Sequence, residues 1–385
     1  MSHPERLFTA RFALMFSFSF TVFLAAFQLL PTAPFQILAL GGGQGEAGLF
    51  LGLLTYASAF SAPLTGAVAD RVGKRRMLLV TSSVIAGLSA CYAVAPGYQW
   101  MLGLVLVHGV FWSGLLTASG AYVTDLLPAT RRTEGLGYWG FASILAVAVA
   151  PSVGLWVFGR GGWTLVCAEA TVLHVVMALI AWRLPADHPH TATQSLHLST
   201  LIEWRVLLLG GTLFLYAFSY GGITSFAALY ADQLSLTPRA LYFTMFSLTI
   251  IVTRPFIARY ADLTDHRRVI VVCLLLVAAG MAVMSMVTSR SHLLLSSVLF
   301  GTGFGSAYPV MVSALMKRVP ASRRGATFGA LIGAFDTGIG SGSIAVGWMG
   351  QWWGLSTAYT VAAVLAACAV PYYIWAERRW AAPTD

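Results

Sequence analysis

The chain has 385 residues, of which 58% are hydrophobic and only 10% carry a charged side chain. About a quarter of the residues of a soluble globular protein are charged, so this composition excludes that class. Apolar runs of about 20 residues, long enough to cross the hydrocarbon core of a bilayer, recur from end to end and predict a polytopic membrane protein.

The formal net charge of +9 could indicate a nucleic-acid partner, but the positions of the cations argue against it. Short loops rich in Lys and Arg stay in the cytoplasm. Nineteen of the 23 Lys and Arg lie in the segments that we expect on that side, which are 1–11, 71–76, 125–134, 183–205, 259–268, 317–324 and 377–385. We therefore expect both termini in the cytoplasm, a bacterial-type cytoplasmic (inner) membrane, and no nucleic-acid partner.

In chain order, the apolar runs predict an all-α polytopic membrane protein with twelve transmembrane helices. The expected spans are 12–34, 47–69, 77–95, 100–122, 135–158, 163–182, 205–230, 239–261, 269–288, 292–315, 325–349 and 355–376. The first span is longer than the core of a usual signal peptide, so we expect it to remain uncleaved. The polar interruption at 184–204 predicts a cytoplasmic linker between two six-helix bundles, at 1–183 and 205–385.

A repeat supports the division into two halves. The stretch from Pro63 to Asp70 parallels Pro255 to Asp262 at an offset of 192 residues. The stretch from Pro128 to Arg132 parallels Pro320 to Arg324 at the same offset. Duplicated halves around a central site are a recurring design of secondary transporters, and parallel halves are one of its forms.

The stretch from Gly66 to Arg76, Gly-Ala-Val-Ala-Asp-Arg-Val-Gly-Lys-Arg-Arg, predicts a tight basic hairpin between two spans. It resembles the helix 2–3 signature of the major facilitator superfamily (MFS) of transporters, in the branch of bacterial drug and metabolite:proton antiporters similar to arabinose-efflux permeases. In that family the acid and its cations latch the two halves together on the cytoplasmic side. Alternatively, the charges only fix the side of the membrane on which this loop lies.

The resemblance implies a latch in which Gly66 lets another helix approach closely and Asp125 pairs with Arg71 or Arg75. The second copy keeps an acid and cations, but Ala258 and Asp265 replace the two glycines. The residues of the expected latch are Gly66, Asp70, Arg71, Gly73, Arg75, Asp125, Asp262 and Arg267.

Helix 5 contains Ala146-x-x-x-Ala150-Pro151-x-x-Gly154. This pattern resembles the Gly-x-x-x-Gly-Pro-x-x-Gly signature of facilitator antiporters, with alanine at two of the glycine positions. The resemblance favours export over import. An ordinary membrane helix bent by its proline is the alternative.

Ionisable groups deep in a bilayer are costly and are functional candidates by default. Asp336 lies about 16 Å into its span at 1.5 Å per residue, and we expect it to carry the coupled proton, with a hydrogen bond between packed helices as the alternative. Arg254, about 10 Å from the end of its span, is an anion or gating candidate, or a side chain that reaches the interface. His108 is a second proton candidate, because Val105 stands where the family often has an arginine. An interhelical hydrogen bond is the alternative for His108.

Glu169 is a third proton candidate, although a structural role is the more expected one for Glu169 and for His174 in the same helix. Polar and aromatic residues in the helices that line the family's cavity could contact substrate. These candidates are Gln28, Tyr56, Trp112, Ser113, Tyr216, Tyr220, Arg254 and Tyr308. Gly301-x-Gly-x-Gly305 and Gly338-x-Gly-x-Gly342 lie inside spans, so we expect close helix packing there rather than nucleotide binding.

The sequence and the resemblance together predict a secondary active transporter that couples efflux of a small drug-like or metabolite compound to protons by alternating access. Uptake or facilitated diffusion of a sugar or organic anion is the alternative within transport. A non-transporting membrane receptor on the same scaffold is the alternative from another class. We expect no enzymatic activity, no metal, and no cofactor beyond the proton gradient. The expected partners are a small-molecule substrate and the lipid bilayer, with the protein as a monomer.

Overall fold

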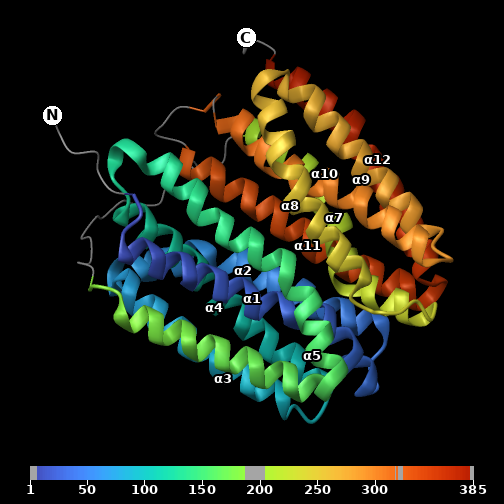
Figure 1. The fold of residues 1–385 in the computed structure, drawn as a ribbon, viewed down its shortest axis with the longest axis horizontal. Coiled ribbons are helices and arrows are strands. Elements are labelled where there is room, and N and C mark those ends of the chain that lie inside the picture. The colour runs from blue at the N-terminus through green and yellow to red at the C-terminus, as the bar shows by residue number, and fades with distance from the viewer. Residues whose placement is uncertain (1–6, 187–203, 317, 320–323, 382–385) are drawn as a thin grey trace. The chain divides into compact units, whose positions relative to one another are not determined.

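The computed structural model describes residues 7–186, 204–316, 318–319 and 324–381. This part of the chain is helical throughout and holds no strand. Its elements, shown in Figure 1, are α1 (Ala10–Ala39), α2 (Gln44–Val72), α3 (Lys74–Ala93), α4 (Tyr98–Leu126), the short 3₁₀ helix η1 (Ala129–Arg131), α5 (Arg132–Arg183), α7 (Trp204–Gln233), α8 (Leu241–Leu263), α9 (His266–Ser285), α10 (Arg290–Met316), α11 (Arg324–Trp353) and α12 (Leu355–Ala381).

Eleven helices within these described ranges are long and apolar enough to cross a membrane. Lipid offers no hydrogen-bond partner to the backbone, so each apolar run satisfies its own peptide groups by forming an α-helix. The longest, α5, has 52 residues and is interrupted by non-helical backbone at Gly161 and Gly162. The φ of Gly162 is +65°, a conformation that glycine adopts without steric cost. The interruption falls between the spans predicted at 135–158 and 163–182.

The helices form two compact units. The first comprises residues 1–33 and 56–193, and within it α3 packs against both α4 and α5 (Figure 1). The second comprises residues 34–55 and 194–385. Within the second, α7 packs against α11 and α12, α9 against α10 and α12, and α8 against α10.

The segment 34–55, which is the end of α1 and the start of α2, groups with the second unit because it hydrogen-bonds to α11. The backbone N–H of Gly45 donates to Gln351 Oε1 at 2.8 Å, and Ser343 Oγ donates to the carbonyl of Gly48 at 2.8 Å. The predicted linker at 184–204 lies mostly outside the described residues.

The two glycine runs of the second unit are helix-packing surfaces, as predicted. A Cβ at Gly338 would lie 2.9 Å from the Cα of Phe214, so α11 and α7 meet backbone to backbone. A Cβ at Gly303 would lie 2.9 Å from the backbone nitrogen of Val277 on α9. Small residues allow such approaches in membranes, where helices gain stability chiefly from close packing.

Candidate functional site

The basic hairpin joins α2 to α3 through a single residue, Gly73. Its φ of +97° is a left-handed conformation that glycine supplies without strain. Asp70 and Arg71, at the end of α2, are exposed. No heavy atom of the described residues lies within 4 Å of where a Cβ of Gly66 would be. The approach of another helix at Gly66 therefore stays a prediction.

Within the hairpin, Lys74 rather than the predicted Arg71 or Arg75 is paired with Asp125. Lys74 Nζ donates to Asp125 Oδ2, which ties the start of α3 to the end of α4. Successive residues of an α-helix point about 100° apart. Because α3 begins at Lys74, that residue faces α4 and the next one faces elsewhere.

Arg75 faces the end of α5. Its Nη2 donates to the carbonyl of Trp182, and its Nε donates to the carbonyl of Ala181 at 3.4 Å. The last carbonyls of a helix have no partner within the helix and carry its negative dipole end. The guanidinium of Arg75 therefore stabilises the end of α5 and fastens α3 to it.

In the second copy of the hairpin, the helix that follows begins with a different kind of residue. Asp265 occupies the position of Gly73 in the repeat, with a φ of −68°, and its Oδ1 accepts a hydrogen bond from the backbone N–H of Arg267 at 3.0 Å. A side-chain cap thus begins α9 where a left-handed glycine begins α3. The predicted latch residue Asp262 has a side chain outside the described part of the structure.

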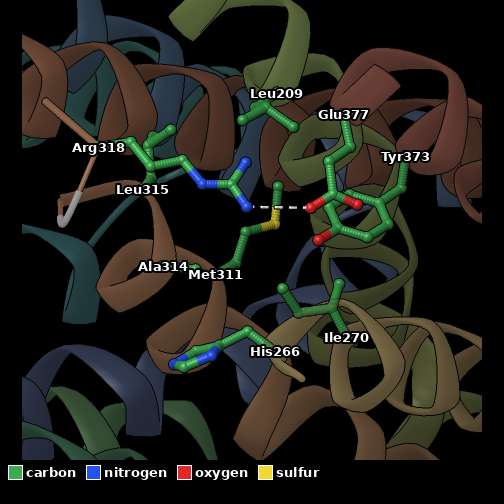
Figure 2. A pocket seen from close by; sticks show the side chains of 9 residues that line it. All are labelled: Leu209, His266, Ile270, Met311, Ala314, Leu315, Arg318, Tyr373 and Glu377. Atoms are coloured by element: carbon green, nitrogen blue, oxygen red, sulfur yellow. Dashed lines mark hydrogen bonds and ion pairs between the residues drawn. The ribbon is translucent and has the colours of Figure 1, made fainter. Parts of the chain in front are cut away.

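Arg267 contributes to a cluster that the sequence did not reveal. Its Nε lies 3.2 Å from Glu377 Oε2 on α12, and Arg318 Nη2 lies 3.2 Å from Glu377 Oε1. Figure 2 shows Arg318 and Glu377 facing each other across a pocket lined by Leu209, His266, Ile270, Met311, Ala314, Leu315, Arg318, Tyr373 and Glu377. Arg75 and Arg267 are repeat equivalents, and each connects its helix to the last helix of its own unit.

The antiporter-like signature of α5 faces the interior of the first unit. Ala146, Ala150, Pro151 and Gly154 are all buried. The backbone stays helical through Pro151, since the non-helical residues of α5 are Gly161 and Gly162. A Cβ at Gly154 would lie 2.7 Å from the carbonyl oxygen of Gln28, so α5 and α1 approach closely at this point.

The first unit gathers several predicted residues in its interior. Gln28 is 1% exposed, and its amide nitrogen and oxygen lack hydrogen-bond partners among the described residues. Glu169 of α5 interacts with the Gln28 side chain, although Glu169 Oε2 is itself unpartnered within the described chain. Trp112 packs edge-on against Phe23 of α1, with ring centroids 5.6 Å apart.

Three other candidates in this unit have partners of their own. Ser113 shares a hydrogen bond of 3.1 Å with Thr65, which joins α4 to α2. Tyr56 is stacked with Phe60 at 6.1 Å. His108 is 1% exposed and lies 3.2 Å from the Tyr92 hydroxyl through Nδ1. Contact of these three residues with substrate stays a prediction.

The second unit brings its predicted aromatic residues into one stack around Phe304 of α10. The ring of Tyr216 lies 4.5 Å from that of Phe304, and the ring of Tyr220 lies 4.2 Å from it. The Tyr216 hydroxyl also donates to the carbonyl of Phe304. Tyr308, one turn further along α10, contacts Phe335 of α11 at 4.9 Å. Phe304 and Phe335 were not predicted, because a phenylalanine in a membrane span carries no sequence signal that separates a cavity wall from packing.

The two charged candidates of this unit each interact electrostatically with one tyrosine of this group. Asp336 is twelve residues into α11, about 18 Å along a helix of about 45 Å, and it interacts electrostatically with Tyr308. Arg254 is nine residues before the end of α8, about 14 Å in, and interacts with Tyr216. An ionisable side chain halfway along a membrane-spanning helix is a functional candidate.

No group of three or more His, Cys, Asp or Glu side chains among the described residues is arranged to hold a metal ion. The four cysteines of the chain are all unpaired in the structure.

Comparison with known proteins gives consistent results. The sequence profile of the Major Facilitator Superfamily matches residues 8–242 and 208–384. The chain is 25% identical over 310 residues to a multi-drug resistance efflux pump PmrA homolog of Lactococcus lactis, covering 76% of each chain. It is 23% identical over 308 residues to the multi-drug resistance efflux pump PmrA of Streptococcus pneumoniae, covering 76% of this chain and 77% of the relative.

Among solved structures, a point mutant of the nucleoside transporter NupG matches with a TM-score of 0.79. The two sequences are 14% identical, and the match covers 95% of this chain and 99% of the other. At this identity the match shows a shared fold alone.

Proposed function

The chain belongs to the Major Facilitator Superfamily and is a multi-pass membrane transporter, not an enzyme; from that premise we propose that it exports a small, partly apolar compound in exchange for protons. In this proposal α5 crosses the membrane twice, with the break at Gly161 and Gly162 between the crossings, so that the chain has twelve spans. Both termini lie in the cytoplasm of a bacterial-type inner membrane, as the distribution of Lys and Arg predicts.

The observation that carries the proposal is the position of Asp336. Asp336 lies midway along a membrane-spanning helix and interacts electrostatically with Tyr308. Charged side chains at this depth are retained where they bind ions, protons or substrate. In the proposed cycle Asp336 takes a proton from the outer side and releases it to the cytoplasm while substrate moves outward.

Two structural observations and the comparison with known proteins support export of a partly apolar compound. Gly154 and Pro151 of the antiporter-like signature are buried in the first unit, where Gly154 contacts α1. The ring stack around Phe304 includes Phe335, the residue before Asp336 in α11. Relatives that cover three quarters of the chain carry the name of multidrug efflux pumps.

Arg254 favours a second candidate function, which is transport of an organic anion. It is only partly exposed, lies within α8, and interacts electrostatically with Tyr216. An arginine that is not neutralised by a carboxylate can bind a carboxylate or phosphate through two parallel hydrogen bonds. Arg254 makes no ion pair with any residue that the structure describes.

The two candidates are separated by proton movement in inverted membrane vesicles loaded with a pH-sensitive dye. A panel of drugs, metabolites and organic anions is added to vesicles whose lumen has been acidified. Export predicts that a cationic or neutral apolar compound releases lumenal protons, that Asp336→Asn abolishes the release, and that Asp232→Asn, at the end of α7, preserves it. Movement of an organic anion without proton release, lost in Arg254→Gln, would instead establish the second candidate.

A further inference from the structure

The end of α1 and the start of α2 are packed onto the second unit, although the rest of both helices belongs to the first. Residues 34–55, which we call the strap, group with residues 194–385, whereas residues 1–33 and 56–193 group together. In a transporter whose halves move against each other around a central site, a helix that belongs to both halves must either bend or lose its contacts with one of them. The contacts of the strap and the bonding of the two helices favour bending.

The strap meets α11 backbone to backbone. Ser343 Oγ donates its one hydrogen to the carbonyl of Gly48, so its oxygen accepts from Ser225 Oγ of α7, at 2.7 Å. A Cβ at Gly48 would lie 2.4 Å from the carbonyl oxygen of Ser343. A Cβ at Gly347 would lie 2.5 Å from the carbonyl oxygen of Gln44. Close approach of this kind stabilises helix pairs in membranes.

Two further contacts hold the strap to the second unit. Near the start of the strap, the guanidinium of Arg239 lies over the ring of Phe35, 5.1 Å from its centroid. An ion pair of 2.6 Å with Asp232 holds that arginine in place. At the start of α2, the backbone N–H of Gly45 donates to Gln351 Oε1 at 2.8 Å. The partners of the strap in these contacts all belong to residues 194–385.

The boundary of the strap in α1 coincides with a weak point of that helix. Pro31 and Pro34 have no backbone N–H, so two carbonyls one turn earlier have no partner within the helix. Between the two prolines, Thr32 Oγ1 donates to the carbonyl of Gln28 at 2.8 Å. Prolines and hydrogen bonds of this kind from threonine are common causes of bends in helices. The two units divide α1 within this stretch, between residues 33 and 34.

The boundary in α2 has the same character. Thr55 Oγ1 shares its hydrogen between the carbonyls of Leu51, at 3.1 Å, and Gly52, at 3.0 Å. Ser61 Oγ donates to the carbonyl of Ala57 at 2.6 Å, and Pro63 removes one backbone hydrogen bond just beyond it. The units divide α2 between residues 55 and 56. Packing and helix bonding are independent observations, and they place the boundary at similar positions in both helices.

We propose that the strap stays on the second unit when the two halves of the transporter move, and that α1 bends at 31–34 and α2 at 55–63 to allow it. The remaining parts of α1 and α2, which carry Gln28 and Tyr56, move with the first unit. The inference rests on the packing of the strap and on the bonding of the two helices. It holds whichever compound is transported and in whichever direction.

Distances between spin labels, measured by pulsed electron paramagnetic resonance on the frozen full-length protein in lipid nanodiscs, test the proposal without any substrate. Exposed positions are labelled through Ala39→Cys in the strap, Thr357→Cys in the second unit and Gln99→Cys in the first, with the exposed Cys91 and Cys368 changed to serine. A frozen sample contains every conformation that is populated. We expect a single narrow distribution of distances between the strap and the second unit, and a broad or double distribution between the strap and the first. A broad distribution to the second unit, or a narrow one to the first, would overturn the proposal.

Loosening the strap provides the second readout. The methyl group added by Gly48→Ala would overlap the backbone of Ser343, so the distribution between the strap and the second unit should broaden. Gly87→Ala adds the same group to α3, where no heavy atom of the described residues lies within 4 Å of the Cβ position, and should leave both distributions unchanged. If Gly48→Ala does not fold, Ser343→Ala replaces it, since that change removes the hydroxyl that donates to Gly48. A distribution that stays narrow in the loosened variant would mean that these contacts do not hold the strap, and would overturn the proposal.

Discussion

Replacing Gly154 by alanine would place a methyl group between α5 and α1. The new Cβ would lie 2.7 Å from the carbonyl oxygen of Gln28, 2.8 Å from its Cα and 2.9 Å from its Cβ. Heavy atoms in contact normally lie about 3.5–4.0 Å apart. Two of the three atoms belong to the backbone of α1, so no rotation of a side chain relieves the overlap. The helices must move apart by several tenths of an ångström.

The expected change in the free energy of unfolding follows from two opposing effects. Alanine is favoured over glycine inside a helix by about 0.5–1 kcal/mol. Overpacking a close-packed interior costs about 1–3 kcal/mol. Gly159→Ala in the same helix gains the first effect without the second, because no heavy atom of the described residues lies within 4 Å of its Cβ position. The two variants should therefore differ in their free energy of unfolding by about 1–3 kcal/mol, with Gly154→Ala the less stable.

Thermal unfolding in detergent, followed by the fluorescence of the 12 tryptophans, ranks the wild type and the two variants by unfolding temperature. We expect Gly154→Ala to unfold at the lowest temperature and Gly159→Ala at or above the wild-type temperature. Equal midpoints for the two variants would refute the close approach of α5 to α1 and, with it, a packing role for the signature of α5.

Three further predictions concern charged groups at the helix ends. Arg75→Ala should lower the free energy of unfolding by about 1–2 kcal/mol, because it removes charged hydrogen bonds to the end of α5. As a control in the same unfolding assay, Arg76→Ala should change that free energy by less than about 0.5 kcal/mol, because Arg76 is exposed. Glu377→Gln should lower the free energy of unfolding by about 1 kcal/mol, since its two arginine partners are partly exposed. This loss should shrink in concentrated salt, and a loss that does not depend on salt would contradict the ion pairs. Hydrogen bonds from Arg131 hold the pKa of Glu134 below its ordinary value of 4.5. The stability that this pair contributes is therefore complete above pH 4.5 and is lost as the pH falls through the lowered pKa. In a carbon-13 NMR titration, Arg131→Gln should raise the pKa of Glu134 towards 4.5.

The sequence was most informative where a single physical requirement decides the structure. Apolar runs must become helices in lipid, so the spans followed from composition alone. The glycine runs at 301–305 and 338–342 were correctly predicted to be packing surfaces, because a span has no other use for so many small residues. The break in α5 lies at Gly161 and Gly162, in the interval between two predicted spans.

The side-chain partners could not be predicted in the same way. Lys74 and Arg75 are neighbours in the sequence, yet one faces α4 and the other the end of α5. Which of them faces which helix depends on where α3 begins, and one residue changes the direction by about 100°. His174 was expected to have a structural role because its helix is peripheral in the resembling fold. Its partner Ser89 could not be identified, because it is 85 residues away in the sequence. Glu377 lies outside both copies of the repeat pattern, so nothing in the sequence indicated its arginine partners.

The central claim is that Asp336 couples substrate movement to protons, and it is tested most directly by comparing two assays on the same variant in proteoliposomes. Asp336→Asn keeps the shape of the side chain but cannot carry a proton. We expect this variant to exchange substrate across the membrane when both sides contain it, and to fail to concentrate substrate when a proton gradient is applied. Retention of gradient-driven accumulation by Asp336→Asn would contradict the assignment of the coupled proton to this residue.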